Sequence, residues 1–310
     1  MRATWRACAA LALSAGLAFG AAPANANVIK HVFVIVMENE DSSSIYGDAK
    51  APYINSLLET SAHTLKFADE LPGPIPSEPH YVYMEAGTNA FSDHTFTTDE
   101  DPSAANSTSS PKHLVTQMKA KGVTWRSYVE NRTVATGACP IVSAGLYAAK
   151  HVPFVFFHDV AGSPPSSTAA PCVNHTSPFT DLARDIAAKS VPGYAFITPN
   201  LCDDMHGATG CVGNEITLGD TWLKQNLPAL IAYAKANAGV IFITWDEAES
   251  TPYMAFIAVG PGVKPGYASS VAYDHGSMLK SVEGIFGLPY LATVTHKNDL
   301  ADLFKAGAYP

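Results

Sequence analysis

The sequence predicts an α/β fold in which a largely parallel central sheet carries helices on both faces. Two apolar runs, at residues 32–37 and 240–245, contain β-branched and aromatic residues without polar alternation, as is typical of strands buried on both faces. Strand and helix patterns alternate along the chain, which favours parallel pairing. The chain is also long enough to bury one large core, so we expect residues 27–310 to form one domain.

The individual elements follow from apolar periodicity and from helix-breaking residues. Strands are expected at 29–37, 123–128, 193–197, 240–245 and 254–259. Helices are expected at 53–61, 77–86, 114–121, 180–188, 220–236 and 277–286, and Gly87, Gly122 and Gly287 stop three of them. Residues 92–110 and 160–174 are rich in loop-forming residues, so both are expected to be surface loops.

The N-terminus predicts export. Arg2 and Arg6 flank the start of an apolar stretch from Ala7 to Phe19, and Ala24-Asn25-Ala26 fits a small-x-small cleavage site. Residues 1–26 are therefore expected to be a secretory signal peptide, which makes the mature protein secreted or periplasmic. No later segment has eighteen uninterrupted apolar residues, so we expect no stable membrane insertion.

Cysteine usage fits the same compartment. Cleavage removes Cys8 and leaves four cysteines, and an even count in an oxidising compartment predicts two disulfides. Cys202 and Cys211 enclose a short Gly-containing loop, so we pair them and pair Cys139 with Cys172. A cysteine-based metal site is the alternative, but no C-x-x-C spacing supports it.

The charge of the chain restricts its partners. Removing the two signal-peptide arginines takes the formal charge from −9 to about −11. This balance argues against nucleic acid or an anionic membrane as a standing partner. An anionic substrate would need local help from a metal ion or from histidines.

Acidic residues follow both of the apolar runs. Glu38-Asn39-Glu40 comes after the first, and Asp246-Glu247 comes after the second. Ligands of open α/β sheets bind beyond the carboxyl ends of the strands, and carboxylates gathered there need a cation or a basic group. The pattern predicts a metal site. The alternative is that these acids cap the helices that follow.

Several stretches, taken in order along the chain, carry a family resemblance. They are 31–39, 51–57, Pro76-Ser77-Glu78-Pro79-His80-Tyr81, 147–154, 198–206, Thr244-Trp245-Asp246-Glu247 and 275–288. With them the chain resembles the secreted phosphoesterases of the alkaline phosphatase superfamily, which include acid phosphatases and bacterial phospholipases C. The resemblance implies an alkaline-phosphatase-like sandwich fold.

The resemblance also implies a nucleophile and a metal site. Ser77 matches the family's nucleophile, at a turn opening a helix whose N–H groups can bind phosphate. It could equally be a helix-capping serine, or serve both purposes. The implied metal ligands are Glu38, Asn39, Ser77, Asp246 and Glu247. An all-oxygen set favours one divalent ion such as calcium, magnesium or manganese, while zinc remains possible.

Further residues are implied to bind phosphate or to transfer protons. His206 and His275 are expected as catalytic residues that bind phosphate, ligate metal or protonate the leaving oxygen. The expected substrate-binding residues are His80, Lys150, His151, Asn200 and Asp204. A histidine acid predicts an activity optimum of roughly pH 5–7.

The chain departs from the family pattern at three positions. His80 stands where the family usually has Asn, Ile75 where it often has His, and Cys202 where some relatives have Asp. The ligands of a second metal are therefore not clearly all present, and we expect one metal ion.

These inferences lead to a secreted, metal-dependent phosphomonoesterase that works through a phosphoserine and is a monomer. Its substrate would be a small phosphate ester or a lipid head group. One alternative is a phosphodiesterase of the phospholipase C type. Another is a catalytically silent secreted protein that binds a metal ion and phosphate.

Overall fold

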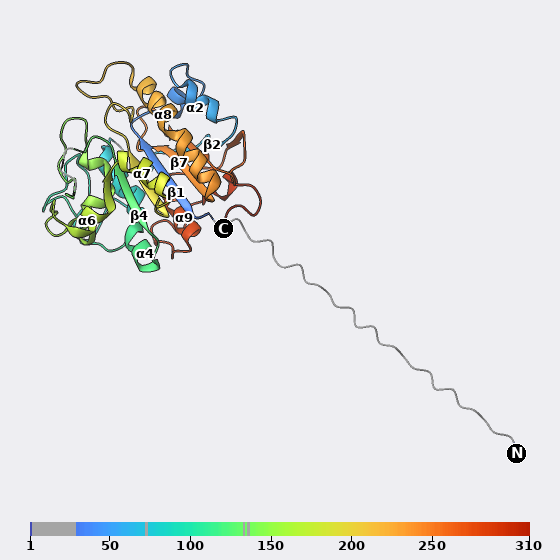
Figure 1. Ribbon diagram of the computed structural model, residues 1–310. Coiled ribbons are helices and arrows are strands. Elements are labelled where there is room, and N and C mark those ends of the chain that lie inside the picture. Colours follow the sequence, from blue (N-terminus) through green and yellow to red (C-terminus); the bar gives the residue numbers. More distant parts are fainter. Residues whose placement is uncertain (2–28, 72–73, 133, 135–136) are drawn as a thin grey trace.

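The computed structural model describes residue 1 and residues 29–71, 74–132, 134 and 137–310. Eight strands form its main sheet, in the order β10-β2-β9-β7-β1-β6-β4-β5 (Figure 1). At the centre lie β1 (His31–Met37), β7 (Gly239–Trp245) and β6 (Tyr194–Thr198). The other strands are β2 (Ala62–Thr64), β4 (Trp125–Val129), β5 (Thr176–Pro178), β9 (Phe256–Val259) and β10 (Tyr267–Ser269).

The centre of the sheet is parallel, as predicted. β1 pairs in parallel with both β6 and β7, and β4 continues the parallel pairing on the far side of β6. Every residue of β7 is buried, which confirms a strand covered on both faces. Among the strands of this sheet that the structure describes, β9 runs opposite to both of its neighbours, β2 and β7.

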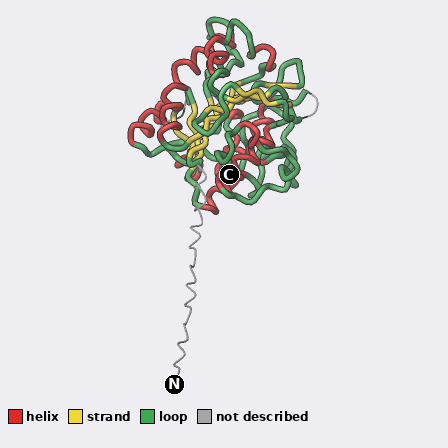
Figure 2. The backbone as a smooth tube through the Cα atoms, turned by 90° about the vertical axis from the view of Figure 1, so that its right-hand side faces the viewer, coloured by secondary structure: helices red, strands yellow, loops and turns green. Residues whose placement is uncertain are grey.

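Helices cover both faces of the sheet, as the side view in Figure 2 shows. On one side, α2 (Pro52–Leu57) packs on α8 (Glu215–Ala236), which also contacts β7. On the other side, α3 (Ser77–Ala86), α4 (Leu114–Lys121) and α9 (His275–Phe286) pack on one another. α7 (Thr180–Ala188) packs on β4 and β5. The predicted α/β sandwich is confirmed.

Most expected helices have the expected ends. α3 and α4 stop at Gly87 and Gly122, which adopt left-handed φ angles of 65° and 76°. α9 begins two residues earlier than expected because Asp274 forms a capping box with Ser277. α8 begins five residues earlier than expected because the side chain of Asn214 accepts a hydrogen bond from the Thr217 N–H.

Two expectations on local structure were wrong. The helix expected at 53–61 ends at Leu57, whose carbonyl accepts hydrogen bonds from the hydroxyls of Thr60 and Ser61. The loop expected at 160–174 contains the end of α5 (His158–Ala161) and most of α6 (Ala170–His175). Pro171 at the start of α6 is compatible with a helix because a first-turn residue needs no intrahelical N–H.

Several short elements were not predicted from the sequence. α1 (Ser42–Ile45) has four residues, and β3 (Phe67–Ala68) forms a separate two-stranded sheet with β8 (Tyr253–Met254). The single strand expected at 254–259 is divided between β8 and β9. The 3-10 helices η1 (Ala149–His151), η2 (Pro153–Phe156) and η3 (Leu300–Leu303) are equally short. Such segments are too brief for a periodic pattern.

Both expected disulfides are formed, Cys139–Cys172 and Cys202–Cys211. The expected signal peptide and Cys8 lie outside the described residues, apart from Met1. No helix in the described part of the chain is both long enough and apolar enough to cross a membrane.

Candidate active site

The two acidic clusters meet at the carboxyl edge of the sheet because their strands are neighbours. Met37 at the end of β1 lies opposite Trp245 at the end of β7. The N–H of Asp246 donates to the Met37 carbonyl over 3.0 Å, and the N–H of Glu38 donates to the Asp204 carbonyl over 2.8 Å. The loop after β6 therefore brings Asp204 to the same place.

Ser77 lies between two carboxylates. Its Oγ is 3.1 Å from Glu38 Oε2 and 3.0 Å from Glu247 Oε1, and the residue is 3% exposed. Pro76 holds the capping position of α3, and the hydrogen bonds of Ser77 Oγ go to Glu38 and Glu247, so the capping interpretation of Ser77 is wrong. Its hydroxyl has a single proton to share between two acceptors.

Asn39 joins the clusters from the end of β1. Its backbone, at a left-handed φ of 37°, donates an N–H to Asp246 Oδ1 over 3.1 Å. Its side-chain oxygen faces acceptors: with the amide turned over, the nitrogen would lie 3.0 Å from Glu38 Oε2 and 3.1 Å from Asp246 Oδ1. In that orientation the Asn39 amide nitrogen donates to both carboxylates and so bridges the two acidic clusters.

The charges of this site demand compensation. Glu38, Asp204 and Asp246 are each fully buried. Burial, followed by the neighbouring carboxylates, raises the pKa of Glu38 and of Asp246 well above the usual range. Asp246 Oδ2 and Asp204 Oδ2 have no hydrogen-bond partner. Oxygen ligands of this number and burial fit a divalent cation, so the residues present suit the metal site expected from the sequence.

His151 lies beside the same carboxylates. Its Nδ1 is 3.3 Å from Glu38 Oε1 and 3.7 Å from Asp204 Oδ2, and its ring stacks on Tyr81 at 4.8 Å. Neither ring nitrogen has a hydrogen-bond partner, and burial, then Lys150, lowers the pKa of His151 well below its usual value. Glu38, His151 and Asp204 thus offer a further set of possible metal-binding atoms.

Lys150 and His206 lie at the more open side of the site. Lys150 Nζ pairs with Asp99. His206 is exposed, its ring centroid lies 6.1 Å from that of His151, and its backbone N–H donates to Asp204 Oδ1 over 2.8 Å.

Asn200 makes local hydrogen bonds within its loop. Its amide nitrogen donates to Asp203 Oδ2 over 2.6 Å, and its side-chain oxygen accepts the N–H of Cys202 over 2.9 Å. These bonds shape the turn that leads to Asp204 and His206. Among the contacts described for Asn200, none is to Ser77.

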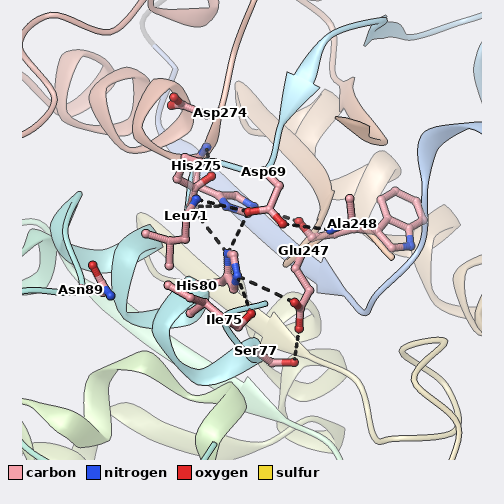
Figure 3. Close-up of polar contacts among 12 residues, drawn as sticks. Asp69, Leu71, Ile75, Ser77, His80, Asn89, Glu247, Ala248, Asp274 and His275 are labelled. Carbon is pink, nitrogen blue, oxygen red and sulfur yellow. Dashed lines mark hydrogen bonds and ion pairs between the residues drawn. The ribbon is translucent and has the colours of Figure 1, made fainter. Parts of the chain in front are cut away.

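His80 and His275 lie on the other side of Glu247 (Figure 3). His80 Nε2 is 3.8 Å from Glu247 Oε2, and His275 Nδ1 is 3.0 Å from Glu70 Oε1. Burial alone would lower the pKa of His275, but the charge and hydrogen bond of Glu70 raise it to about 9. The His275 ring is fully buried, so it does not face solvent.

Sequence reading missed four residues of this region: Tyr81, whose hydroxyl donates to Glu38 Oε1, and Asp69, Glu70 and Asp99. Tyr81 follows Ser77 by four helical residues, a spacing that places both on one face, so it could have been found. Asp69 and Glu70 follow β3, which is too short to recognise. Asp99 lies in a loop whose position depends on tertiary packing.

The sequence profile described as Phosphoesterase family matches residues 57–289, which include Ser77, Asp246 and Glu247. The chain belongs to the phosphoesterase family. The expected family resemblance is thereby confirmed, and the protein is a phosphoric ester hydrolase.

Curated relatives of this phosphoesterase are phosphatases. It is 30% identical over 292 residues to a phosphatidylinositol-3-phosphatase of Mycobacterium tuberculosis, covering 93% of this chain and 86% of the relative. It is 28% identical over 275 residues to a probable acid phosphatase of Kluyveromyces lactis, covering 84% of this chain and 59% of the relative. An acid phosphatase of Aspergillus fumigatus is 27% identical, and this chain spans 55% of its length.

Solved structures support the fold of this phosphoesterase. A phosphonate monoester hydrolase from Silicibacter pomeroyi matches 88% of this chain and 76% of its own, with a TM-score of 0.56 and 11% identity. A protein of the alkaline phosphatase superfamily from Vibrio parahaemolyticus matches 88% of this chain and 69% of its own, with a TM-score of 0.56 and 10% identity. The expected alkaline-phosphatase-like architecture is confirmed.

Proposed function

We propose that this phosphoesterase is a secreted, metal-dependent phosphomonoesterase of the acid phosphatase type, acting through a phosphoserine at Ser77. The observation that carries the proposal is the position of Ser77 Oγ, about 3 Å from both Glu38 and Glu247 at the start of a helix. Either carboxylate can accept the hydroxyl proton. Export is supported by the signal-like residues 1–26 and by the two disulfides.

One divalent cation would be held by oxygens of Glu38, Asn39, Ser77, Asp246 and Glu247. When bound, it would lower the pKa of the serine hydroxyl and neutralise negative charge on the phosphate. The oxygen ligands favour calcium, magnesium or manganese, with zinc as a further candidate.

Cationic and polar groups of this chain would bind the phosphate. Lys150 and His206 would contact the phosphate oxygens that gain charge in the transition state. The buried His151 ring, whose Nδ1 lies 3.3 Å from Glu38 Oε1, would act on the phosphate site through that carboxylate. Asp99 pairs with Lys150 and accepts the N–H of Glu78 over 3.3 Å. Phosphate bound to Lys150 would replace the contact between Lys150 and Asp99.

Chemistry would proceed in two displacements. Ser77 Oγ loses its proton to a carboxylate and bonds to phosphorus as the bond to the leaving oxygen breaks. His206 donates a proton to that oxygen, because its ring is exposed beside the site. Water then attacks the phosphoserine and gives its proton to His206, and inorganic phosphate leaves as Ser77 regains its proton from the carboxylate. A histidine acid gives the expected optimum of roughly pH 5–7.

We assign His275 a positioning role in place of two of the roles expected from the sequence, phosphate binding and protonation of the leaving oxygen. Its buried ring contacts Glu70 and the Trp245 carbonyl, over 3.0 and 2.8 Å, so neither nitrogen is free to meet a substrate. Through the Trp245 carbonyl it orients the peptide that precedes Asp246.

Rates with three chromogenic esters would test this function. We expect the highest kcat/KM with p-nitrophenyl phosphate and loss of activity with a chelator. Faster cleavage of bis-p-nitrophenyl phosphate or p-nitrophenyl phosphorylcholine would instead identify a phosphodiesterase. Tight phosphate binding without turnover of any ester would identify a binding protein.

A further inference from the structure

A second cluster of side chains that could bind a metal ion lies outside the site assigned above: Glu70, His80 and His275. Figure 3 shows its two histidines, with Glu247 between His80 and Ser77. Glu70 follows β3, His80 lies in α3, and His275 begins α9. His80 and His275 are 1% and 0% exposed, and the side chain of Glu70 is 3% exposed. The proposed catalytic chemistry uses none of these three side chains directly.

Both histidines have the same hydrogen-bonding arrangement. His80 Nε2 is 3.2 Å from the Ile75 carbonyl, and His275 Nε2 is 2.8 Å from the Trp245 carbonyl. Because a carbonyl oxygen only accepts, each Nε2 carries a proton. In a neutral ring the lone pair is then on Nδ1. A backbone carbonyl that fixes the tautomer in this way is typical of metal-binding histidines.

The two Nδ1 atoms point at one carboxylate oxygen. Glu70 Oε1 is 3.0 Å from His275 Nδ1 and 4.0 Å from His80 Nδ1. His80 Nδ1 is buried and has no hydrogen-bond partner, although Asp69 Oδ1 lies 3.5 Å away. Ligand atoms about 2.0–2.1 Å from a tetrahedral metal ion lie about 3.3–3.4 Å apart, and the observed separations bracket that spacing.

We propose that Glu70, His80 and His275 form a second metal site of the two-histidine, one-carboxylate type, suited to zinc or a similar transition ion. It differs from the first site, whose ligands are all oxygen atoms. Asp69 is placed to supply a fourth ligand after a small movement. Glu247 lies between the two sites, 3.0 Å from Ser77 Oγ and 3.8 Å from His80 Nε2.

A metal ion in the second site would stabilise the elements that carry the active-site residues. His80 is three residues after Ser77 in α3, and His275 holds the carbonyl that precedes Asp246. A metal ion joining them would fix the nucleophile's helix to the end of β7. This inference goes beyond the proposed function, which requires only the first metal.

A proton is the alternative to a metal ion at this site. His275 would then be an imidazolium paired with Glu70, and no ion would bind. Side-chain ¹⁵N NMR of wild-type protein, before and after addition of zinc, separates the two. We expect zinc to remove the proton from His275 Nδ1 and to shift the Nδ1 signals of both His80 and His275. If zinc leaves both signals unchanged, the proposal is wrong.

Zinc stoichiometry on chelator-treated, reloaded protein gives a second test. We expect wild type to bind one more zinc ion per chain than either His80→Asn or Glu70→Gln, whereas Asp246→Asn should keep the zinc ion of the second site. His63→Asn is the matched control, because His63 also has an unpartnered Nδ1 but packs on Tyr46, and this variant should bind as much zinc as wild type. Circular dichroism verifies folding of each variant. Equal zinc content in wild type and His80→Asn would overturn the proposal of a second site. This result would not affect the first site, which is tested by the zinc content of Asp246→Asn.

Discussion

At the scale of single residues, the site is defined by carboxylates that are buried together. Ser77 has a Glu oxygen on either side, and the Asn39 amide lies about 3 Å from Glu38 Oε2, which Ser77 also contacts, and from Asp246 Oδ1. Buried carboxylates in contact raise one another's pKa, and a cation removes that cost. The side chains proposed to act in catalysis are therefore also ones whose burial destabilises the fold when no cation is bound.

Replacing Ser77 by Ala should reduce kcat with p-nitrophenyl phosphate by at least ~10³-fold, because no other hydroxyl occupies the position of the nucleophile. The fold should be preserved, since Pro76, and not Ser77, holds the capping position of α3. Steady-state kinetics and thermal melting measure the two effects. Ser56→Ala, on the exposed side of α2, is the control and should keep full activity. Wild-type turnover by Ser77→Ala would remove Ser77 as the nucleophile.

The Glu70–His275 pair should make the stability of metal-free protein depend on pH. The pKa of His275 is raised to about 9 in the folded state, so its stabilisation is complete below the unfolded value near 6.5. It is then lost as pH rises from about 6.5 through about 9. Urea unfolding with a chelator should show a loss of up to about 3 kcal/mol across this window in wild type. His275→Gln should lack this part of the slope, and equal slopes would contradict the pair.

At the scale of elements, strand register and loop anchoring place the residues. β1 and β7 end level with one another, so the clusters that follow them must meet. The loop after β6 then carries Asp204 and His206, and the Cys202–Cys211 bond closes it. A loop held at both ends loses less entropy when it contacts a ligand.

Replacing Cys202 and Cys211 together by Ser should impair activity more than fold. A nine-residue separation gives a loop-closure gain of about 2–3 kcal/mol in the chain-entropy model. Because the loop positions His206, we expect KM for p-nitrophenyl phosphate to rise while far-UV circular dichroism is unchanged. Replacing Cys139 and Cys172, which join α6 to a distant loop, is the comparison. Unchanged kinetics in the first variant would show that the bond does not support the site.

At the scale of the whole molecule, metal binding should couple catalysis to stability. Ligands from β1, α3 and β7 converge on the proposed site, and only the folded chain brings them together. An ion at 100 times its dissociation constant would therefore stabilise the fold by about 2.7 kcal/mol.

Chelation should abolish activity and lower the melting temperature, and a divalent ion should restore both. Asp246→Asn should be inactive because it lacks one proposed ligand of the first metal ion. Its melting temperature should respond less to chelator, because it has less bound metal to lose. Differential scanning fluorimetry and the p-nitrophenyl phosphate assay measure the two effects. A wild-type protein that keeps its rate and melting temperature after exhaustive chelation would contradict metal dependence.

Local patterns sufficed for the main helices and for the strands at the centre of the sheet. Residues 32–37 and 240–245 form continuous apolar runs, and Gly87 and Gly122 end helices through left-handed backbone angles. The antiparallel direction of β9 was not predictable in this way. A strand's direction depends on the path of its connections and leaves no mark in its own residue pattern.

The sequence by itself determined the α/β fold, the disulfide pairs and the proximity of Glu38, Asn39 and Asp246, because strand ends in a parallel sheet share one edge. Only the tertiary structure decided that Glu70 contacts His275, that Asp99 pairs with Lys150, and that the ring of His275 is buried. These contacts join loops and helices that are distant in sequence. Their geometry depends on side-chain packing across elements, which residue spacing along the chain does not specify.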